Sequence, residues 1–253
     1  MSENRTTDEG RRQFLGGTLA LGGIAVAPGV FLVNVAGAKP ADQPVTDKVR
    51  WGLLVDTTRC ADGCDACVRA CQEENGWGGP DSNEVKSSDE QKAQWIRKVH
   101  LRNKQTGSTH SLPLMCQHCE HPPCADVCPT GASFRRADGI VLVDKHTCIG
   151  CRYCMMACPY KARSFIHEEL HGQKVNAPRG KGTVESCTFC VHRVDNDREP
   201  ACVEACAAEG RRALIFGDMK DPDSEISQRL KRLGVRQLRA DLGLNPGVHY
   251  EGV

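Results

Sequence analysis

Sixteen of the 253 residues are cysteines, and they fall into four groups of four with none left over. Thiols at this density serve as disulfides, as zinc ligands or as iron ligands, and each use demands a different fold. The groups are Cys60, Cys64, Cys67 and Cys71; Cys116, Cys119, Cys124 and Cys128; Cys148, Cys151, Cys154 and Cys158; and Cys187, Cys190, Cys202 and Cys206.

The third group, CIGCRYCMMACPY at 148–160, follows the bacterial ferredoxin spacing C-x2-C-x2-C-x3-C-P. In such a run a tight loop brings three thiolates to one iron–sulfur cube. The fourth cysteine, where we expect a helix to begin, points to a different cluster. One run is therefore half of a two-cluster unit. The second group, which ends in Cys128-Pro129, is its natural partner.

Three other uses of these thiols compete with ferredoxin-type clusters. Disulfide frameworks are typical of short secreted chains, and cysteines two residues apart in one loop make poor bridges. Zinc would suit the fourth group, but it would give Cys154 and the prolines after the cysteines no role. The C-x3-C-x2-C spacing from Cys60 to Cys67 is also the cluster signature of radical S-adenosylmethionine enzymes, which leave one iron open. We expect Cys71 and Cys206 to complete the sets here, so that no iron stays open.

An internal repeat indicates two ferredoxin-like units. The segment 128–134, CPTGASF, resembles 158–165, CPYKARSF, and the apolar runs at 52–56 and 139–144 each lead through an aspartate to a cysteine loop. Each run predicts a short strand followed by a turn. We therefore expect an α+β fold, rich in loops with short strands and helices. In it two pseudo-symmetric bacterial ferredoxin-like modules are arranged so that one is inserted in the other.

The first residues resemble a twin-arginine export signal. Six Gly and Pro residues interrupt its apolar stretch, which argues against an uncleaved membrane anchor, the alternative interpretation. Because this route exports folded proteins, it suits a protein that receives its cofactor in the cytoplasm. We expect a periplasmic mature chain with no membrane span of its own. The pattern consists of Arg11, Arg12, Phe14 and Leu15, an apolar stretch to residue 35, and the small-x-small sequence AGA at 36–38.

The cysteine groups also set the expected domain boundaries. The formal net charge of +1 gives no sign of nucleic-acid binding, and aromatic residues make up only 5% of the chain. Inorganic cofactors could replace part of the core. The expected parts are a signal peptide at 1–38, a linker at 39–48, the outer module at 49–110 and 171–217, the inner module at 111–170, and a C-terminal extension at 218–253.

The order of the four motifs resembles the four-cluster iron–sulfur subunits of membrane-associated bacterial oxidoreductases, such as those of dimethyl sulfoxide reductase, polysulfide reductase and nitrite reduction systems. The resemblance covers residues 49–216 and is sharpened by CQHCEHPPCADVCPTGASF, CIGCRYCMMACPY, CVEAC and DPDSEISQRL. With the export signal and the DGC sequence of the first group, the chain is most similar to the periplasmic iron–sulfur subunits of sulfite-reductase-associated membrane complexes.

This resemblance implies four [4Fe–4S] clusters with ligands exchanged between groups. The first group departs from the family's C-x2-C spacing, and neither Cys71 nor Cys206 precedes a proline. The implied ligand sets are Cys60, Cys64, Cys67 and Cys206; Cys71, Cys187, Cys190 and Cys202; Cys116, Cys119, Cys124 and Cys158; and Cys128, Cys148, Cys151 and Cys154.

A cluster with four cysteine ligands has no open position, so the chain is expected to relay electrons and not to be an enzyme; no catalytic residue is predicted. The resemblance implies a multi-span quinone-interacting membrane subunit as partner, with a c-type cytochrome and other redox subunits, in dissimilatory sulfur metabolism. The alternatives are the electron-transfer subunit of a molybdopterin reductase and, more remotely, a radical S-adenosylmethionine enzyme.

Several other residues are singled out by their position near the cysteines. Basic side chains beside the inner module would favour reduced clusters, or they are ordinary surface charges. His118 and His121 are expected to form hydrogen bonds or to lie at the surface, not to bind iron. The polar segment 72–97, with Trp77 and Trp95, and a helix at about 224–233 either cover clusters or dock partners. The basic residues are Lys145, Arg152, Lys161 and Arg163.

Overall fold

The computed structural model describes residues 24–27, 30–32, 44–78, 87–102, 104–232 and 234–253. The chain divides into two units, residues 1–43 and 44–253. In the first unit, strands β1 (Ile24–Ala27) and β2 (Val30–Leu32) pair antiparallel. The predicted export motif at Arg11, Arg12, Phe14 and Leu15 lies outside the described residues. None of the helices in the described ranges has the length and apolar character needed to cross a bilayer.

The second unit is built on a four-stranded sheet in the order β10-β3-β12-β11. The central strand β3 pairs antiparallel with β10 and parallel with β12. Its apolar run is buried throughout, with Leu53, Leu54 and Val55 at most 1% exposed, as expected for a strand covered on both faces. The strands are β3 (Trp51–Asp56), β10 (Leu214–Asp218), β11 (Val235–Arg236) and β12 (Val248–Glu251).

The two faces of this sheet pack against different layers. Leu54 and Ile215 meet Ile226 of helix α7 (Glu225–Leu230) in a small apolar cluster. Leu53 and Val55 face the main core, which also holds most of the cysteines. The helix predicted at 224–233 is thus present but shorter. Its N-cap is Ser224, whose hydroxyl accepts a hydrogen bond from the Ser227 amide.

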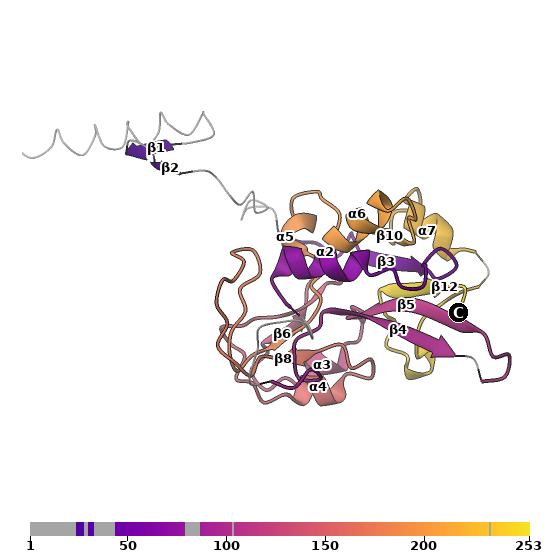
Figure 1. Ribbon diagram of the computed structural model, residues 1–253, viewed down its shortest axis with the longest axis horizontal. Helices are drawn as coiled ribbons and strands as arrows, with labels where there is room; N and C mark the ends of the chain where they lie inside the picture. Colours follow the sequence, from indigo (N-terminus) through magenta and orange to yellow (C-terminus); the bar gives the residue numbers. More distant parts are fainter. Residues whose placement is uncertain (1–23, 28–29, 33–43, 79–86, 103, 233) are drawn as a thin grey trace, which may run out of the picture. The chain divides into compact units, whose positions relative to one another are not determined.

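Two helices from distant parts of the sequence pack along each other beside the sheet. Helix α2 (Ala66–Asn75) contacts α6 (Ala201–Ala208) along its length, so the first and fourth cysteine groups come together. Figure 1 shows α2 and α6 on one side of this unit and the short helices α3 (Pro123–Asp126) and α4 (Tyr153–Ala157) on the other.

The second and third groups lie among very short elements. A hairpin of β6 (Ser133–Arg135) and β7 (Val141–Val143) lies beside α3, which contacts α4. The prediction that a helix begins at the fourth cysteine of the ferredoxin run is wrong, because α4 ends at Ala157, just before Cys158. Four further short elements are β8 (Ser164–Phe165), β9 (Val184–Glu185), α5 (Val191–Val194) and a 3-10 turn, η2 (Ala240–Leu242).

A longer hairpin separates the first two groups along the chain. Strands β4 (Ile96–Arg102) and β5 (Thr109–Met115) pair in register over seven residues. The hairpin extends away from the helices in Figure 1. Its inner end is apolar and buried at Ile96, Leu112 and Met115. The expected mixed α+β, loop-rich fold with short strands is confirmed; its division into inserted ferredoxin-like modules stays a prediction.

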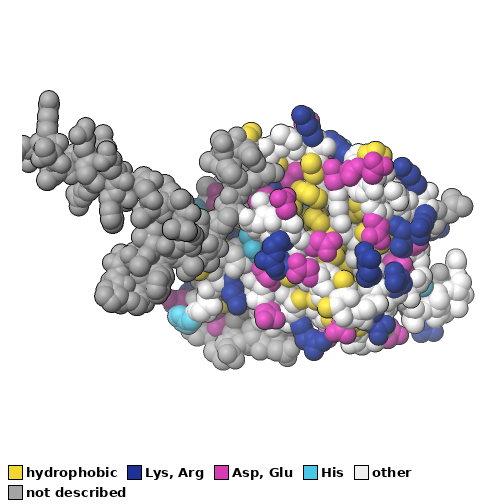
Figure 2. Space-filling model, turned by 90° about the horizontal axis from the view of Figure 1, so that it is seen from above, with side chains coloured by type: hydrophobic (Ala, Val, Ile, Leu, Met, Phe, Trp, Pro, Cys, Tyr) yellow, Lys and Arg dark blue, Asp and Glu magenta, His cyan; other side chains and the backbone are white. Residues whose placement is uncertain are grey.

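Charges are mixed over the surface of the second unit. Figure 2 shows Lys and Arg side chains interspersed with Asp and Glu on the face that it displays. That face therefore presents no continuous basic surface of the kind that binds nucleic-acid phosphates, in keeping with the net charge of +1.

Candidate iron–sulfur cluster sites

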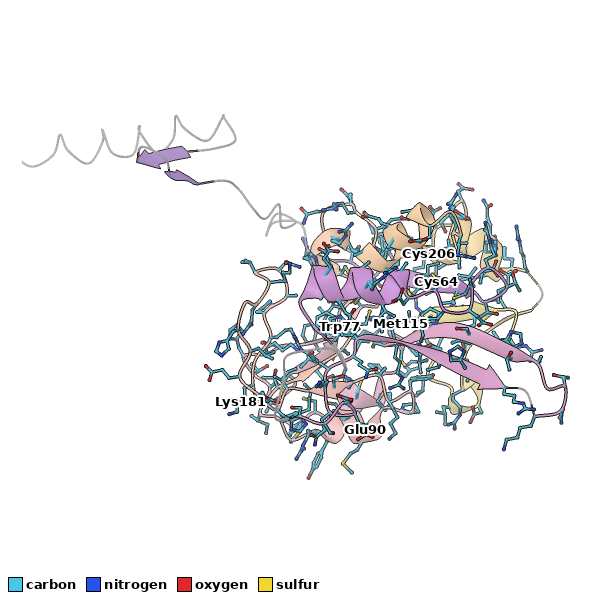
Figure 3. The ribbon with its side chains drawn as sticks, in the orientation of Figure 1. Cys64, Trp77, Glu90, Met115, Lys181 and Cys206 are labelled. Carbon is cyan, nitrogen blue, oxygen red and sulfur yellow. The ribbon has the colours of Figure 1, made fainter. Side chains whose placement is uncertain are left out.

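Sixteen free thiols are present in the described part of the chain, and the structure gathers twelve of them around three cavities. The first cavity has a volume of about 350 Å³ and is lined by Cys60, Cys64, Cys67 and Cys206. Cys64 and Cys206 lie close together in Figure 3, at the ends of the α2 and α6 segments. The Nζ atom of Lys98 on β4 donates a hydrogen bond to Cys60 Sγ at 2.9 Å.

The second cavity, of about 330 Å³, is lined by Cys71, Cys187, Cys190 and Cys202. Its hydrogen-bond donors are neutral. Trp77 Nε1 donates to Cys71 Sγ at 3.3 Å, and Asn75 Nδ2 donates to the same sulfur at 3.5 Å. The backbone N–H of Phe189 donates to Cys187 Sγ at 3.5 Å. Trp77 and Met115, labelled in Figure 3, lie in this part of the core.

The third cavity, of about 300 Å³, is lined by Cys128, Cys148, Cys151 and Cys154. The backbone N–H of Ser133 donates to Cys128 Sγ at 3.3 Å. Burial acts to raise the pKa of Cys128, but this hydrogen bond and those of Thr130 outweigh it, so the pKa lies below its usual value. Cys151 is exposed.

The remaining four cysteines also lie together. The thiol of Cys119 interacts electrostatically with those of Cys116, Cys124 and Cys158. Arg163 Nη2 donates to Cys124 Sγ at 3.0 Å from a buried position. The structure thus brings together the members of each set that the family resemblance implied.

The same backbone turn recurs in all four groups. The residue just before the second cysteine has a positive φ each time: 74° at Gly63, 43° at His118, 72° at Gly150 and 52° at Phe189. A left-handed residue turns the chain sharply, so that successive backbone N–H groups can face one concavity. At Gly150 only glycine fits, because a Cβ would lie 2.2 Å from the Gly182 carbonyl oxygen. This shared turn is structural support for the repeat found in the sequence.

Burial keeps most of these thiols protonated in the absence of a cation. It raises the pKa of Cys67, Cys116 and Cys119 to about 12 each. Iron ligation needs thiolates, and a polynuclear iron group supplies the positive charge that such buried thiolates lack. In the described residues no three His, Cys, Asp or Glu side chains are arranged around a single metal ion. The thiols stand instead in sets of four, and side-chain or backbone N–H groups donate to their sulfurs, so this donor set fits a thiolate-ligated [4Fe–4S] cluster.

The histidines and basic residues near the cysteines have separate roles. His118 is buried and its Nδ1 accepts a hydrogen bond from the Val141 amide at 3.0 Å, while burial lowers its pKa to about 3. The predicted hydrogen-bonding role of His118 is thus confirmed, and His121 lies at the surface. Lys145 donates to the Val184 carbonyl oxygen at 2.7 Å, and burial lowers its pKa to about 8. Lys161 is exposed.

Three more predicted residues need correction or refinement. Trp77 and Trp95 are 2% and 4% exposed, so they are not exposed docking anchors, and segment 72–97 covers clusters at these points. Arg152 is exposed and lies 5.0 Å above the Phe165 ring. Sequence reasoning missed Lys98, Asn75 and their sulfur contacts. Lys98 lies 27 residues beyond the first group, and nothing in its local sequence signals a return to Cys60.

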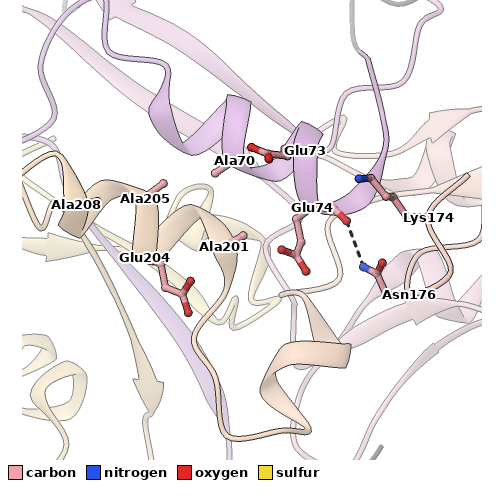
Figure 4. Close-up of a pocket in the computed structure, with 9 residues that line it drawn as sticks. All are labelled: Ala70, Glu73, Glu74, Lys174, Asn176, Ala201, Glu204, Ala205 and Ala208. Carbon is pink, nitrogen blue, oxygen red and sulfur yellow. Dashed lines mark hydrogen bonds between the residues drawn. The ribbon is translucent and has the colours of Figure 1, made fainter. Parts of the chain in front are cut away.

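An open groove lined by no cysteine lies between α2 and α6, with an alanine floor and acidic walls (Figure 4). Glu74 is already engaged there: its carboxylate accepts from Arg193 Nη1 at 2.8 Å, and its backbone oxygen accepts from Asn176 Nδ2 at 3.2 Å.

Four thiol sets in a loop-rich α+β fold define a multi-cluster iron–sulfur protein. Residues 108–218, which hold three of the four groups, match the model of the 4Fe-4S dicluster domain. The chain is 43% identical to the "Hdr-like menaquinol oxidoreductase iron-sulfur subunit 1" of Archaeoglobus fulgidus, over 95% of this chain and 97% of that protein.

Two further relatives agree with this class. The chain is 36% identical to a tetrathionate reductase subunit of Salmonella typhimurium, over 97% of this chain and 89% of the relative. It is 40% identical to a sulfite dehydrogenase subunit of Allochromatium vinosum, over 78% and 81%. The chain belongs to the family of iron–sulfur subunits of oxidoreductases that these proteins represent. Its cofactors are [4Fe–4S] clusters, four for sixteen cysteines.

Proposed function

We propose that this chain is the periplasmic electron-transfer subunit of a membrane complex and passes electrons between a quinone-interacting membrane protein and other redox subunits. The observation that carries the proposal is the gathering of sixteen cysteines into four closed sets of four. A [4Fe–4S] cluster supplies reversible one-electron chemistry when bound. With every iron held by a cysteine, no position stays open for a substrate, so the chain is a relay and not an enzyme.

The proposed ligands exchange the last cysteine between groups. Cys206 joins the first group and Cys71 joins the fourth, because α2 and α6 run side by side. Cys158 joins the second group and Cys128 joins the third. The three thiol-lined cavities support three of these sets, and the mutual electrostatic interaction of the remaining four thiols supports the last.

The partner at the membrane is proposed to be a multi-span subunit that binds the quinone. The printed name of the archaeal relative refers to menaquinol, and no quinone site is evident among the cysteine-lined cavities. A c-type cytochrome or another redox subunit would take the opposite end of the relay. The twin-arginine motif at Arg11 and Arg12 would direct the folded, loaded chain to the periplasm.

The cavity of Cys128, Cys148, Cys151 and Cys154 has the features of a docking end. Large apolar side chains around it are exposed: Ile149 at 67%, Tyr153 at 58% and Met156 at 74%. Such a patch beside a redox centre lets a partner exclude water and approach closely. We propose that the quinone-interacting subunit covers this patch.

A second candidate places the chain beside the catalytic subunit of a sulfur-compound reductase or dehydrogenase. The names of the relatives from Salmonella and Allochromatium, which refer to tetrathionate and sulfite, favour this candidate. In both cases the chain would carry electrons in sulfur metabolism. Identification of the subunits that copurify with the native chain distinguishes the two.

The central experiment measures electron exchange with and without the membrane partner. Isolated holoprotein should be reduced by dithionite but should react slowly with a quinol analogue, and membranes that contain the partner should accelerate the reaction. Met156→Glu should slow the membrane-dependent reaction about tenfold, since a charge in an apolar docking patch opposes desolvation. Val175→Glu, at a position 94% exposed outside the patch, is the matched control. Rapid exchange with quinol by the isolated chain would refute the proposal.

A further inference from the structure

A buried ion pair lies next to the second cavity. Arg179 and Glu185 are 5% and 0% exposed. The two side chains meet through two parallel bonds: Nη2 donates to Oε1 at 2.9 Å, and Nε donates to Oε2 at 3.0 Å. The carboxylate also accepts a hydrogen bond from Trp95 Nε1 at 2.9 Å. A pair with two bonds fixes direction as well as distance, so both side chains have one defined orientation.

The guanidinium of this pair reaches the end of helix α2. Its Nη1 donates to the Gly76 carbonyl oxygen at 2.7 Å. Gly76 caps α2 with a φ of 71°, and its carbonyl belongs to the peptide unit that leads into Trp77. The indole of Trp77 in turn donates from Nε1 to Cys71 Sγ at 3.3 Å. Arg179 therefore holds the turn that directs a donor at a cysteine sulfur.

The carboxylate of the pair lies beside another segment of the same cavity. Glu185 is the last residue of β9 and precedes Cys187 by two residues. Its partner Trp95 lines the second cavity together with Cys71 and Cys187. One ion pair thus connects two segments, far apart in the sequence, that each supply a cysteine to one proposed ligand set.

The two charges of the pair cancel, which separates its effect from that of a cation beside sulfur. Lys98 places a positive charge against Cys60 Sγ, whereas Arg179 and Glu185 together add no net charge near the second cavity. Apolar residues of similar volume often stabilise a core as well as a buried ion pair does. Neither stability nor charge therefore accounts for this pair, and its contribution to the site is the geometry that it imposes.

We propose that this ion pair positions the sulfur donor of the second cavity: it keeps the turn at Gly76 in the conformation that brings Trp77 Nε1 within hydrogen-bond distance of Cys71 Sγ. Arg179 and Glu185 are thus positioning residues that act on the cluster through the indole. A donor to a ligating sulfur favours the reduced, more negative cluster, so loss of the pair lowers the midpoint potential of that cluster. This inference rests on the proposed ligand set of the second cavity.

The experiment uses isolated holoprotein loaded anaerobically, in four forms: wild type, Trp77→Phe, the double variant Arg179→Met/Glu185→Gln, and the triple variant with all three changes. The double variant removes both charges together, so no unpaired charge stays buried, and the new amide oxygen still accepts from Trp95. In an EPR-monitored redox titration, it should lower the same midpoint that Trp77→Phe lowers. The reduction equilibrium should change about threefold, or about 30 mV for a one-electron couple.

The triple variant decides whether the pair acts through Trp77. Its midpoint should fall no further than that of Trp77→Phe, because both changes remove one hydrogen bond. The proposal is overturned by an additive fall, by a fall in a different midpoint, or by four unchanged midpoints in Trp77→Phe or in the double variant. The matched control is Arg239→Met/Asp241→Asn, which removes an exposed ion pair of 2.9 Å and should move no midpoint.

Iron and sulfide contents are measured on the same samples, so that incomplete loading is separated from a change in potential. If the double variant does not load fully, Arg179→Lys replaces it, because lysine keeps the charge but lacks the planar fork. The same midpoint should then fall in wild type and not in Trp77→Phe, and any other result overturns the proposal. If neither variant loads fully, loss of the EPR signal that Trp77→Phe shifts supports the proposal, and loss of another signal contradicts it. No partner or quinone is used, so failure here is distinct from failure of the proposed relay.

Discussion

The regions around the two pairs of cysteine groups differ in what surrounds their thiols. The outer region, with the first and fourth groups, rests on a four-stranded sheet and two packed helices, and its two cavities have separate donors. The inner region, with the second and third groups, has strands of three residues and helices of four and five. The thiols of the outer region thus lie beside longer regular elements than those of the inner region, although residues of both regions belong to one apolar core.

The largest effect that tests this comparison is removal of iron. Metal binding supplies folding free energy where the protein alone lacks it, so the inner region should depend on its clusters more than the outer sheet does. After anaerobic chelation, amides of β6, β7, α3 and α4 should lose protection against hydrogen exchange by roughly a hundredfold or more. Those of β3 and β10 should retain most of theirs, because α7 still covers one face of the sheet.

Hydrogen exchange followed by mass spectrometry measures this difference on peptides from each region, with the loaded protein as reference. If both regions lost protection equally, the outer sheet would have no stability of its own and the predicted difference between the regions would be wrong. If the sheet lost more protection than the inner region, the outer region would be the one that depends more on its clusters.

A smaller effect tests whether each outer cavity has its own hydrogen-bond donor to a cysteine sulfur. Lys98→Met removes the charged donor to Cys60 Sγ while it keeps a long apolar side chain. We expect one midpoint potential to fall, by about 60 mV, since a hydrogen bond to a charged group contributes about 1.5 kcal/mol and 1.4 kcal/mol corresponds to tenfold. Redox titration should show the other three unchanged. A fall in two potentials would show that Lys98 acts on more than one cluster.

Trp77→Phe is the matched change at the other outer cavity. It removes a neutral donor to Cys71 Sγ and keeps a buried aromatic ring. Charge-assisted hydrogen bonds are about twice as strong as neutral ones, so the shift should be about half that of Lys98→Met and confined to a different cluster. A larger shift than that of Lys98→Met would contradict the ranking of donors.

The sequence alone indicated the cysteine loops more clearly than the scaffold that surrounds them, and the assignment of cysteines to ligand sets stays a prediction. Cysteine spacing predicts local loops. In each loop the residue before the second cysteine has a positive φ; these second cysteines are Cys64, Cys119, Cys151 and Cys190. The strands at 51–56 and 141–143 followed from their apolar runs. The pattern of apolar residues along the chain could not predict which distant segments contact each other. The pairing of β12 with β3, for example, joins residues nearly 200 positions apart, and His249 of β12 is itself polar.

The donors to sulfur were hidden from the sequence for the same reason. In the sequence Lys98 is one polar residue of strand β4. Its hydrogen bond to Cys60 Sγ depends on how the β4–β5 hairpin packs near Cys60. Arg163 was singled out by its proximity to Cys158, but its burial and its hydrogen bond to Cys124 Sγ depend on the turn held by Arg97. A surface charge and a buried one look alike in sequence, and only packing separates them.

The smallest effect concerns an ionic contact that joins helix α7 to strands β3 and β12 of the outer sheet. Arg229 on α7 donates to Asp56 Oδ2 at 2.9 Å and also to Glu251. Burial acts to raise the pKa of Asp56, but hydrogen bonds from Thr58 and Arg229 outweigh it, and the pKa lies below its ordinary value. A depressed folded-state pKa contributes stability that is present above the unfolded value of about 3.9 and is lost as the pH falls through the folded value.

Arg229→Met should therefore destabilise the outer sheet on the order of 2 kcal/mol near pH 7, because hydrogen bonds to two carboxylates are lost. The difference from wild type should shrink as the pH falls below about 4 and through the lowered pKa that Asp56 has in the wild-type protein. The measurement is the rate of cluster loss in mild denaturant for the variant and for the wild type at each pH. The ratio of the two rates is compared, because it cancels the acid lability that both proteins share. Arg212→Met, which removes an exposed pairing with Glu225, is the control and should change the ratio little at any pH. If the Arg229→Met ratio stayed constant from pH 7 to well below pH 4, the contact would not act through the charge of Asp56, and the stability of the outer sheet would have to come from its apolar layers alone.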